Sequence, residues 1–202
     1  ISVTTPYGTA VSTASFRIIQ LQPPPRVAGQ QWPHDYAQNV AASQATGTQQ
    51  NLVSVSDGVG GVIEVWQDGR DGTQDIYAQR ITVYGAIAAG WPADGLAVCT
   101  GPGDQTVPAA VADGAGGVLI AWQDSRNDGG DIYAQHVLND GTTEATWPAN
   151  GLAVCTAPNV QAEPTITADR SCGAFIAWQD LRTGSWDIYA QHVTALGAVA
   201  QG

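Results

Sequence analysis

The chain of 202 residues carries 18 acidic side chains against seven arginines and no lysine, and its formal net charge at pH 7 is −11. This balance argues against binding to nucleic acid or to an anionic membrane surface, since both need a field of positive charge. No apolar run approaches the roughly 18 residues that a membrane-spanning helix needs, so we expect no membrane insertion.

The first residues do not resemble a leader sequence. The chain contains no methionine, and Ile1 does not open the charged region and apolar core of a signal peptide. We therefore expect the chain to be a processed or excised piece of a longer polypeptide.

Residues 1–21 differ in pattern from the rest of the chain. Polar and apolar side chains alternate over residues 1–10 and 11–19 around a Pro/Gly turn, which predicts two strands of a hairpin. A lone hairpin is marginally stable in water, so we expect the rest of its sheet to lie further toward the N-terminus or on another chain. The proline run within residues 22–30 predicts a stiff, extended linker.

From residue 31 onward the chain repeats itself with a period of 56 residues. Three blocks share this spacing: Trp-Gln-Asp at Trp66, Trp122 and Trp178; Asp-Ile-Tyr-Ala-Gln at Asp75, Asp131 and Asp187; and Trp-Pro at Trp91 and Trp147. Repetition at a fixed period indicates a supersecondary unit that cannot bury its apolar face alone and stacks on copies of itself.

The second unit illustrates the strands that the repeat predicts. Residues 106–112 form a short strand that ends at an Asp-Gly turn, a strong hairpin signal because such turns need positive φ. The almost continuous apolar run at 118–122 is typical of a strand buried on both faces. Residues 131–138 alternate as a third strand, and residues 152–156 form the last one. The two faces of the third strand are expected to be Ile132, Ala134 and His136 against Tyr133, Gln135 and Val137.

Four short antiparallel strands per unit, without helical periodicity, predict an all-β protein made of four-stranded β-propeller blades. A β-sandwich is the alternative, but sandwiches do not repeat their sequence at the spacing of one four-stranded sheet. The propeller segment spans residues 31–202. Its predicted parts are a fourth-strand remnant at 32–46, blades at 47–102 and 103–158, and a partial blade at 159–202.

Trp32-Pro33 is a degenerate copy of Trp91-Pro92, with 36–42 as the remnant strand. The segment therefore begins with a fourth strand and ends with the first three strands of a unit, which is the phase that closes a propeller ring. Three blades are too few for closure, because propellers carry about four to eight. We expect either that the natural chain continues or that copies associate to complete a ring.

The order of a Pro-containing strand, Asp-Gly, an apolar strand ending in Trp-Gln-Asp-x-Arg, and Asp-Ile-Tyr resembles the TolB-like propeller repeats. It is especially similar to the propellers of large secreted and cell-surface proteins of bacteria and archaea. The resemblance covers residues 31–202. Residues 1–21 are similar to the closing strands of an immunoglobulin-like TIG domain. These resemblances imply an extracellular or cell-surface location and a scaffold that does not define a ligand.

Each unit places an aspartate two residues before an arginine, and a second aspartate seven residues after the first. The sets are Asp68, Arg70 and Asp75; Asp124, Arg126 and Asp131; and Asp180, Arg182 and Asp187. One hypothesis is a calcium loop, because Asp-rich turns supply hard oxygen ligands. The other is an arginine held between two carboxylates that staples the turn. We favour the second, since each loop has its own cation and the third lacks acids where Asp71 and Asp128 stand.

The repeated Trp-Gln-Asp tryptophans end apolar strands, so we expect them in the core. Trp91, Trp147 and Trp186 are better candidates for exposure. For these three we favour a role as hydrophobic pegs over a role as ligand platforms. His136 and His192 share one repeat position with Arg80, which favours a solvated or hydrogen-bonded strand position over catalysis. The cysteines, Cys99, Cys155 and Cys172, are expected to be buried free thiols that act as small hydrophobes.

The sequence supports no catalytic, cofactor-binding or metal-binding residues. No Ser-His-Asp arrangement is indicated, and the glutamates Glu64, Glu144 and Glu163 are not repeated. We expect a non-enzymatic secreted or cell-surface propeller segment with a structural, adhesive or protein- or glycan-binding role. The alternative is part of a carbohydrate-active propeller, a lectin or glycoside hydrolase, with its catalytic residues outside this segment. A periplasmic TolB-like interaction module is a third class.

Other copies of the chain, other surface-protein chains and glycans are the expected partners. The open ends of a three-blade arc should expose faces between blades, with Val118, Ile120 and Trp122 among their residues. Such apolar patches seek partners. We therefore expect self-association, for example into a filament.

Overall fold

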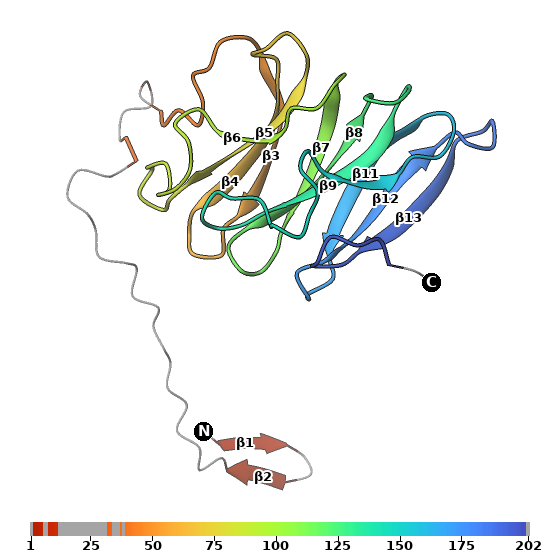
Figure 1. Cartoon of the computed structure of the whole chain (residues 1–202). Coiled ribbons are helices and arrows are strands. Elements are labelled where there is room, and N and C mark those ends of the chain that lie inside the picture. Colours follow the sequence, from red (N-terminus) through yellow and green to blue (C-terminus); the bar gives the residue numbers. More distant parts are fainter. Residues whose placement is uncertain (1, 6–7, 12–31, 34–36, 38, 201–202) are drawn as a thin grey trace.

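The computed structural model describes residues 2–5, 8–11, 32–33, 37 and 39–200 (Figure 1). These residues form strands, turns and loops, which confirms the all-β prediction. Within them, no helix has the length and apolarity needed to cross a membrane. The strands are β1 Ser2–Thr5, β2 Gly8–Val11, β3 Gln49–Ser56, β4 Val62–Asp68, β5 Asp75–Ile81, β6 Leu96–Cys99, β7 Gln105–Ala112, β8 Val118–Asp124, β9 Asp131–Val137, β10 Leu152–Cys155, β11 Gln161–Ala168, β12 Ala174–Asp180 and β13 Asp187–Val193.

The N-terminal hairpin forms within the described residues. β1 pairs with β2 in antiparallel fashion, and Thr5 lies opposite Gly8. The predicted continuation to residue 19 and the linker at 22–30 lie outside the described residues.

The repeated units form three antiparallel sheets in which strands adjacent in sequence are neighbours in space. We call β3–β6 the first sheet, β7–β10 the second sheet and β11–β13 the third sheet. In the second sheet each strand boundary lies within two residues of its prediction. The third sheet has the three strands predicted for the partial unit. The strand predicted at 36–42 does not form in the described part of that segment, residues 37 and 39–42.

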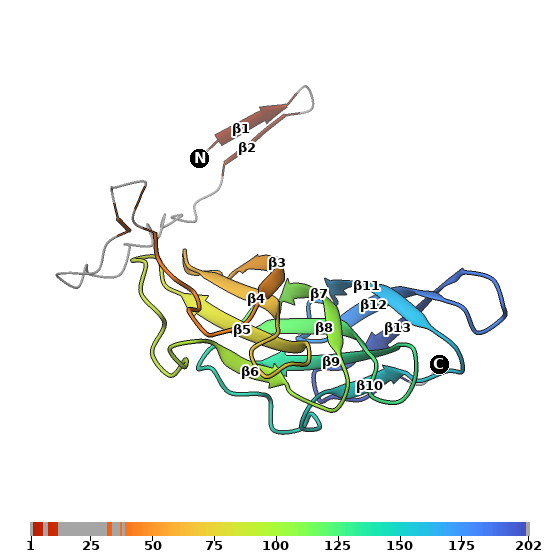
Figure 2. The same ribbon diagram turned by 90° about the horizontal axis from the view of Figure 1, so that it is seen from above.

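The three sheets lie side by side in sequence order (Figure 1). β7 contacts β3 and β4, and β11 contacts β7 and β8. Seen from above, β3, β7 and β11 lie along one edge, with β6 and β10 along the opposite edge (Figure 2). Each sheet therefore packs one face against the next sheet, as expected for units that cannot bury an apolar face alone.

Two apolar clusters join the sheets. The first contains Ile63, Val65, Ile76 and Ala78 of the first sheet and Val118, Ile120 and Trp122 of the second. The other contains Leu119, Ala121, Ile132 and Ala134 of the second sheet and Ala174, Ile176 and Trp178 of the third. β8 supplies residues to both clusters, so the prediction of a strand buried on both faces is confirmed.

The exposed apolar face is not the one that we predicted. Val118, Ile120 and Trp122 are fully buried, because they form the contact between the first and second sheets. The third sheet instead exposes Phe175 (51%) and Ile188 (75%). The positions one repeat earlier, Leu119 and Ile132, are buried beneath the third sheet.

The first strand of every sheet contains a bulge that the sequence analysis did not foresee. Pairing with the second strand shifts after Gln50, Thr106 and Ala162. Asn51, Val107 and Glu163 have φ between 51° and 52°. Positive φ is uncommon for a β-branched residue such as valine. Because the bulge recurs with three different residue types, the repeat geometry imposes it, and bulges increase local strand twist.

Gly151 permits close packing of the fourth strand on the core tryptophan. Its φ is +98°, and a Cβ built there would lie 2.6 Å from the Trp122 indole and 3.2 Å from the Ala134 carbonyl oxygen. Gly95 has the same relation to Trp66 in the first sheet. A side chain at either position would therefore meet both unfavourable dihedral angles and an occupied space.

Gly151→Ala should lower the free energy of unfolding by roughly 2–4 kcal/mol, because overpacking adds to the conformational cost. Gly114→Ala is the matched control: its φ is +84° and nothing lies within 4 Å of the built Cβ. That change should cost only about 1 kcal/mol. Urea unfolding of the two variants provides the measurement, and equal losses would contradict the packing account.

Candidate functional site

The repeated turn after the second strand forms a buried polar cluster. In the second sheet, Asp124 is fully buried and accepts hydrogen bonds from Trp122 Nε1 at 2.8 Å and from the backbone N–H of Arg126 at 3.0 Å. Arg126 also donates from Nε at 2.8 Å and from Nη2 at 2.6 Å, as a two-pronged ion pair. Four donors therefore compensate one buried carboxylate. The same pattern occurs at Asp68 and Asp180.

The arginine of this cluster also joins other parts of the fold. The guanidinium of Arg126 lies over the ring of Tyr133, 4.0 Å from its centre, and donates to the carbonyl of Asn150 at 2.8 Å. It also lies 3.2 Å from Cys99 Sγ, which belongs to the preceding sheet. The cluster thus connects the turn, the third strand and the neighbouring sheet, so its role is structural.

The prediction that each arginine lies between two carboxylates is only partly correct. The first aspartate of each set binds the arginine, but within the described residues no hydrogen bond joins the second aspartate to it. Asp131 instead accepts from Asn127 Nδ2 at 2.8 Å, and Asp187 from Thr183 Oγ1 at 2.7 Å. The described part of the chain also contains no group of three or more His, Cys, Asp or Glu side chains that could hold a metal ion.

In the first set the two aspartates differ in the direction of their pKa shifts. At Asp68 burial alone would raise the pKa, but hydrogen bonds from Arg70 and Trp66 hold it below the ordinary value. Burial, with the nearby carboxylates Asp71 and Asp68, raises the pKa of Asp75 to about 6. Asp131 is shifted upward too, again chiefly by burial. Asp75 is therefore a less stable anion than Asp68.

A second repeated constellation lies at the hairpin between the first and second strands. In the second sheet, Asp113 Oδ1 accepts from the N–H groups of Ala115 and Gly117 at 2.6 and 2.9 Å, and Oδ2 lies 2.9 Å from His136 Nε2. Asp169 and His192 repeat this pair, and Asp57 and Arg80 take its place in the first sheet. The hydrogen-bonded strand position predicted for the histidines is confirmed.

The Asp–His pairs lack the groups that nucleophilic catalysis needs. His136 is only 4% exposed, and its Nδ1 has no partner among the described residues. Neither His136 nor His192 has a hydrogen bond to a hydroxyl or thiol in the described part of the structure. A base needs a nucleophile within reach, so these pairs fasten the hairpin to the third strand.

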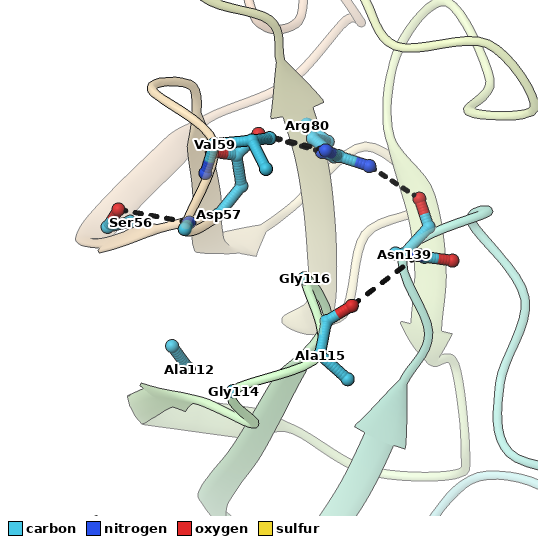
Figure 3. Close-up of a pocket in the computed structure, with 10 residues that line it drawn as sticks. Ser56, Asp57, Val59, Arg80, Ala112, Gly114, Ala115, Gly116 and Asn139 are labelled. Atoms are coloured by element: carbon cyan, nitrogen blue, oxygen red, sulfur yellow. Dashed lines mark hydrogen bonds and ion pairs between the residues drawn. The ribbon is translucent and has the colours of Figure 1, made fainter. Parts of the chain in front are cut away.

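A cavity of about 390 Å³ lies between the hairpins of the first and second sheets (Figure 3). Asp57 and Arg80 form its polar wall on one side, with Asn139 facing them from the second sheet. Arg80 donates to Asp57 from Nε and Nη2 and to the Asn139 carbonyl from Nη1, so its charge is already compensated. The cavity can hold a small polar molecule, but it contains no paired nucleophile and base.

The tryptophans expected at the surface divide into two groups. Trp91 and Trp147 are only 6% and 5% exposed, so the prediction of exposure is wrong for them. Their indole N–H groups donate to the carbonyls of Asn139 and Ala195 in the following sheet, which confirms their role as pegs. Trp186 is 53% exposed, as predicted.

The three cysteines are free thiols, as predicted, although only Cys99 is fully buried and Cys155 and Cys172 are half-buried. Burial raises the pKa of Cys99 to about 11. Because the thiolate is the reactive form, Cys99 is unreactive near neutral pH.

No protein-family model matches the chain, and no curated protein matches it. The repeat pattern and the geometry of the sheets therefore carry the functional proposal.

Arg126→Ala should destabilise the protein by about 1–3 kcal/mol, because it leaves the buried Asp124 carboxylate without its cation. Arg126→Lys keeps the charge but loses the two-pronged contact and the stacking on Tyr133, so an intermediate loss is expected. Thermal melts provide the measurement. Stabilisation of the unaltered chain by calcium, reversed by a chelator, would contradict the ion-pair account.

Asp75→Asn should stabilise the folded protein at pH 7.5 by roughly 1–2 kcal/mol. The folded pKa of Asp75 lies above the unfolded value, so its ionisation weakens the fold as pH rises from about 4 to about 6. The gain should therefore shrink toward zero as pH falls to 4. Asp187→Asn is the control, because Asp187 is exposed. Denaturant unfolding across this pH range measures both, and a gain independent of pH would refute the assignment.

Proposed function

We propose that the chain is a non-enzymatic β-propeller segment of a secreted or cell-surface protein, with a structural, adhesive or binding role. Three equivalent sheets packed face to face, with their first strands along one edge, support a propeller arrangement. The motif resemblance to propellers of bacterial and archaeal surface proteins supports the location.

The non-enzymatic part of this proposal rests on one observation. The repeated charged side chains bond to one another and to backbone groups: arginines to the turn aspartates, histidines to the hairpin aspartates. Active sites instead hold ionisable groups aimed at a space for substrate. Side chains used in this way stabilise a scaffold, and the apolar face of the third sheet is left for binding.

Glycan binding is a second candidate, supported by the turn between β12 and β13. Trp186 exposes about half of its surface there, beside the polar groups of Thr183, Ser185 and Asp187. An exposed ring flanked by hydroxyl and carboxylate groups suits the apolar and polar parts of a sugar. The equivalent residues in the other sheets, Gln74 and Gly130, have no ring, so this platform would be unique to the third sheet.

Hydrolysis assays and binding assays on a broad panel of polysaccharides test these two roles. The main proposal predicts no release of reducing sugar from any polysaccharide, and detectable hydrolysis would contradict it. Glycan binding that is lost in Trp186→Gln, which introduces the residue of the first sheet, would favour the second candidate. The substitution should leave the fold unchanged, as circular dichroism can verify, because the side chain is exposed.

A further inference from the structure

The segment before the first sheet occupies the place of a fourth-strand region from a preceding unit. Trp32 Nε1 donates to the Val83 carbonyl at 2.9 Å, just as Trp91 Nε1 donates to the Asn139 carbonyl one repeat later. Thr100 N–H donates to Asn150 Oδ1 at 3.1 Å. One repeat earlier, the pair is Gln44 N–H and Asp94 Oδ1 at 2.9 Å. Two matched contacts therefore place Trp32 and the residues around Gln44 at the end of a unit.

Among the described residues, none of the first three strands of that unit lies beside Trp32 and residues 39–48. The third sheet has the opposite composition: it contains a first, second and third strand, and β13 has no fourth-strand neighbour among the described residues. The residues before the first sheet and the third sheet thus correspond to complementary parts of one four-stranded unit.

The third sheet also has an exposed apolar face that another sheet could cover. Phe175 and Ile188 lie exposed on it, where the equivalent residues of the second sheet are buried. At both internal contacts the first strand of the following sheet, β7 or β11, lies against the preceding sheet, and its second and third strands add apolar side chains to the shared cluster. The elements of the same kind that remain on this chain are β3, β4 and β5.

We propose that the third sheet of one molecule binds the first sheet, Trp32 and residues 39–48 of a second copy of this chain, and that two copies close head to tail. Each contact between the two copies would then resemble the contacts between the first and second sheets and between the second and third sheets within one chain. This inference rests on the proposed propeller arrangement, because two chains of three sheets give six, which lies within the usual range of about four to eight. Head-to-tail contacts form closed rings when the rotation between subunits closes.

Backbone groups at the two ends match in the same way. Gln105 N–H donates to the Gln74 carbonyl at 2.6 Å across the first contact, and Gln161 N–H to the Gly130 carbonyl at 2.7 Å across the second. One repeat before Gln105 stands Gln49, and one repeat after Gly130 stands Trp186. The proposed contact therefore pairs the Gln49 N–H of one copy with the Trp186 carbonyl of the other.

The contact between copies should be weaker than the internal contacts. Ser54 and Glu64 stand on the first sheet where the second has Ala110 and Ile120. Ser54 Oγ donates to Glu64 Oε2 at 2.5 Å, so the face is polar at this point. Burying the Glu64 carboxylate without a cationic partner is costly. This cost predicts an association that reverses on dilution.

Analytical ultracentrifugation of the 202-residue chain over a wide concentration range tests the proposal. The expected result is a reversible pair of about twice the 20.9 kDa of one chain. Phe175→Asp should weaken the pairing at least about tenfold, and Glu64→Ile should strengthen it by at least about tenfold, since one places and the other removes a buried charge. Leu196→Asp is the matched control. Leu196 is 72% exposed, and its equivalent in the second sheet is Asp140, so the pairing should not change.

Three outcomes would overturn the proposal. The chain could stay monomeric with and without Glu64→Ile. This result would indicate that a further repeat of a longer polypeptide covers the exposed face of the third sheet. A ladder of larger species would show that the pair does not close. Pairing whose strength does not change in Glu64→Ile would indicate that the third sheets of the two copies contact each other. None of these outcomes bears on hydrolysis, so this test and the test of the proposed function can fail independently.

Discussion

The structure depends on one constraint: none of its sheets can bury its apolar surface alone. β8 shows this most clearly, because Leu119 faces the third sheet while Ile120 faces the first, and both are buried. Each interior face is covered by the first strand of the following unit, together with apolar side chains of its second and third strands. Burial of apolar surface is the main favourable contribution to folding, so the order of units, their phase and the exposure of the last face all follow from this stacking.

The buried aspartate clusters also link neighbouring sheets. A carboxylate such as Asp124 is stable in the core only because the indole and guanidinium groups surround it with donors. The same guanidinium then reaches Cys99 of the preceding sheet, so one residue stabilises a turn and spans a contact between sheets. This double role explains why acid, arginine and aromatic residues recur together in each unit.

Much of this architecture could be predicted from the repeat, since period, turn signals and alternation act locally. The strands of the second sheet and the two faces of β9 followed from such patterns. Other features depend on contacts that no local pattern encodes. Trp91 and Trp147 lie in connections and were expected at the surface, yet the following sheet covers them. The bulge at Val107 and the exposure of Phe175 likewise reflect neighbours distant in sequence.

Amide hydrogen exchange of β9 and β13 tests the stacking account most directly. The two strands have the identical sequence Asp-Ile-Tyr-Ala-Gln-His-Val, so their intrinsic exchange rates match and only their surroundings differ. β9 lies between two strands of its sheet and beneath the third sheet, whereas β13 is an edge strand with Ile188 exposed. At a dilution where the chain is monomeric, the account predicts slow exchange in β9 and much faster exchange in β13. Equal protection of the two strands would contradict it.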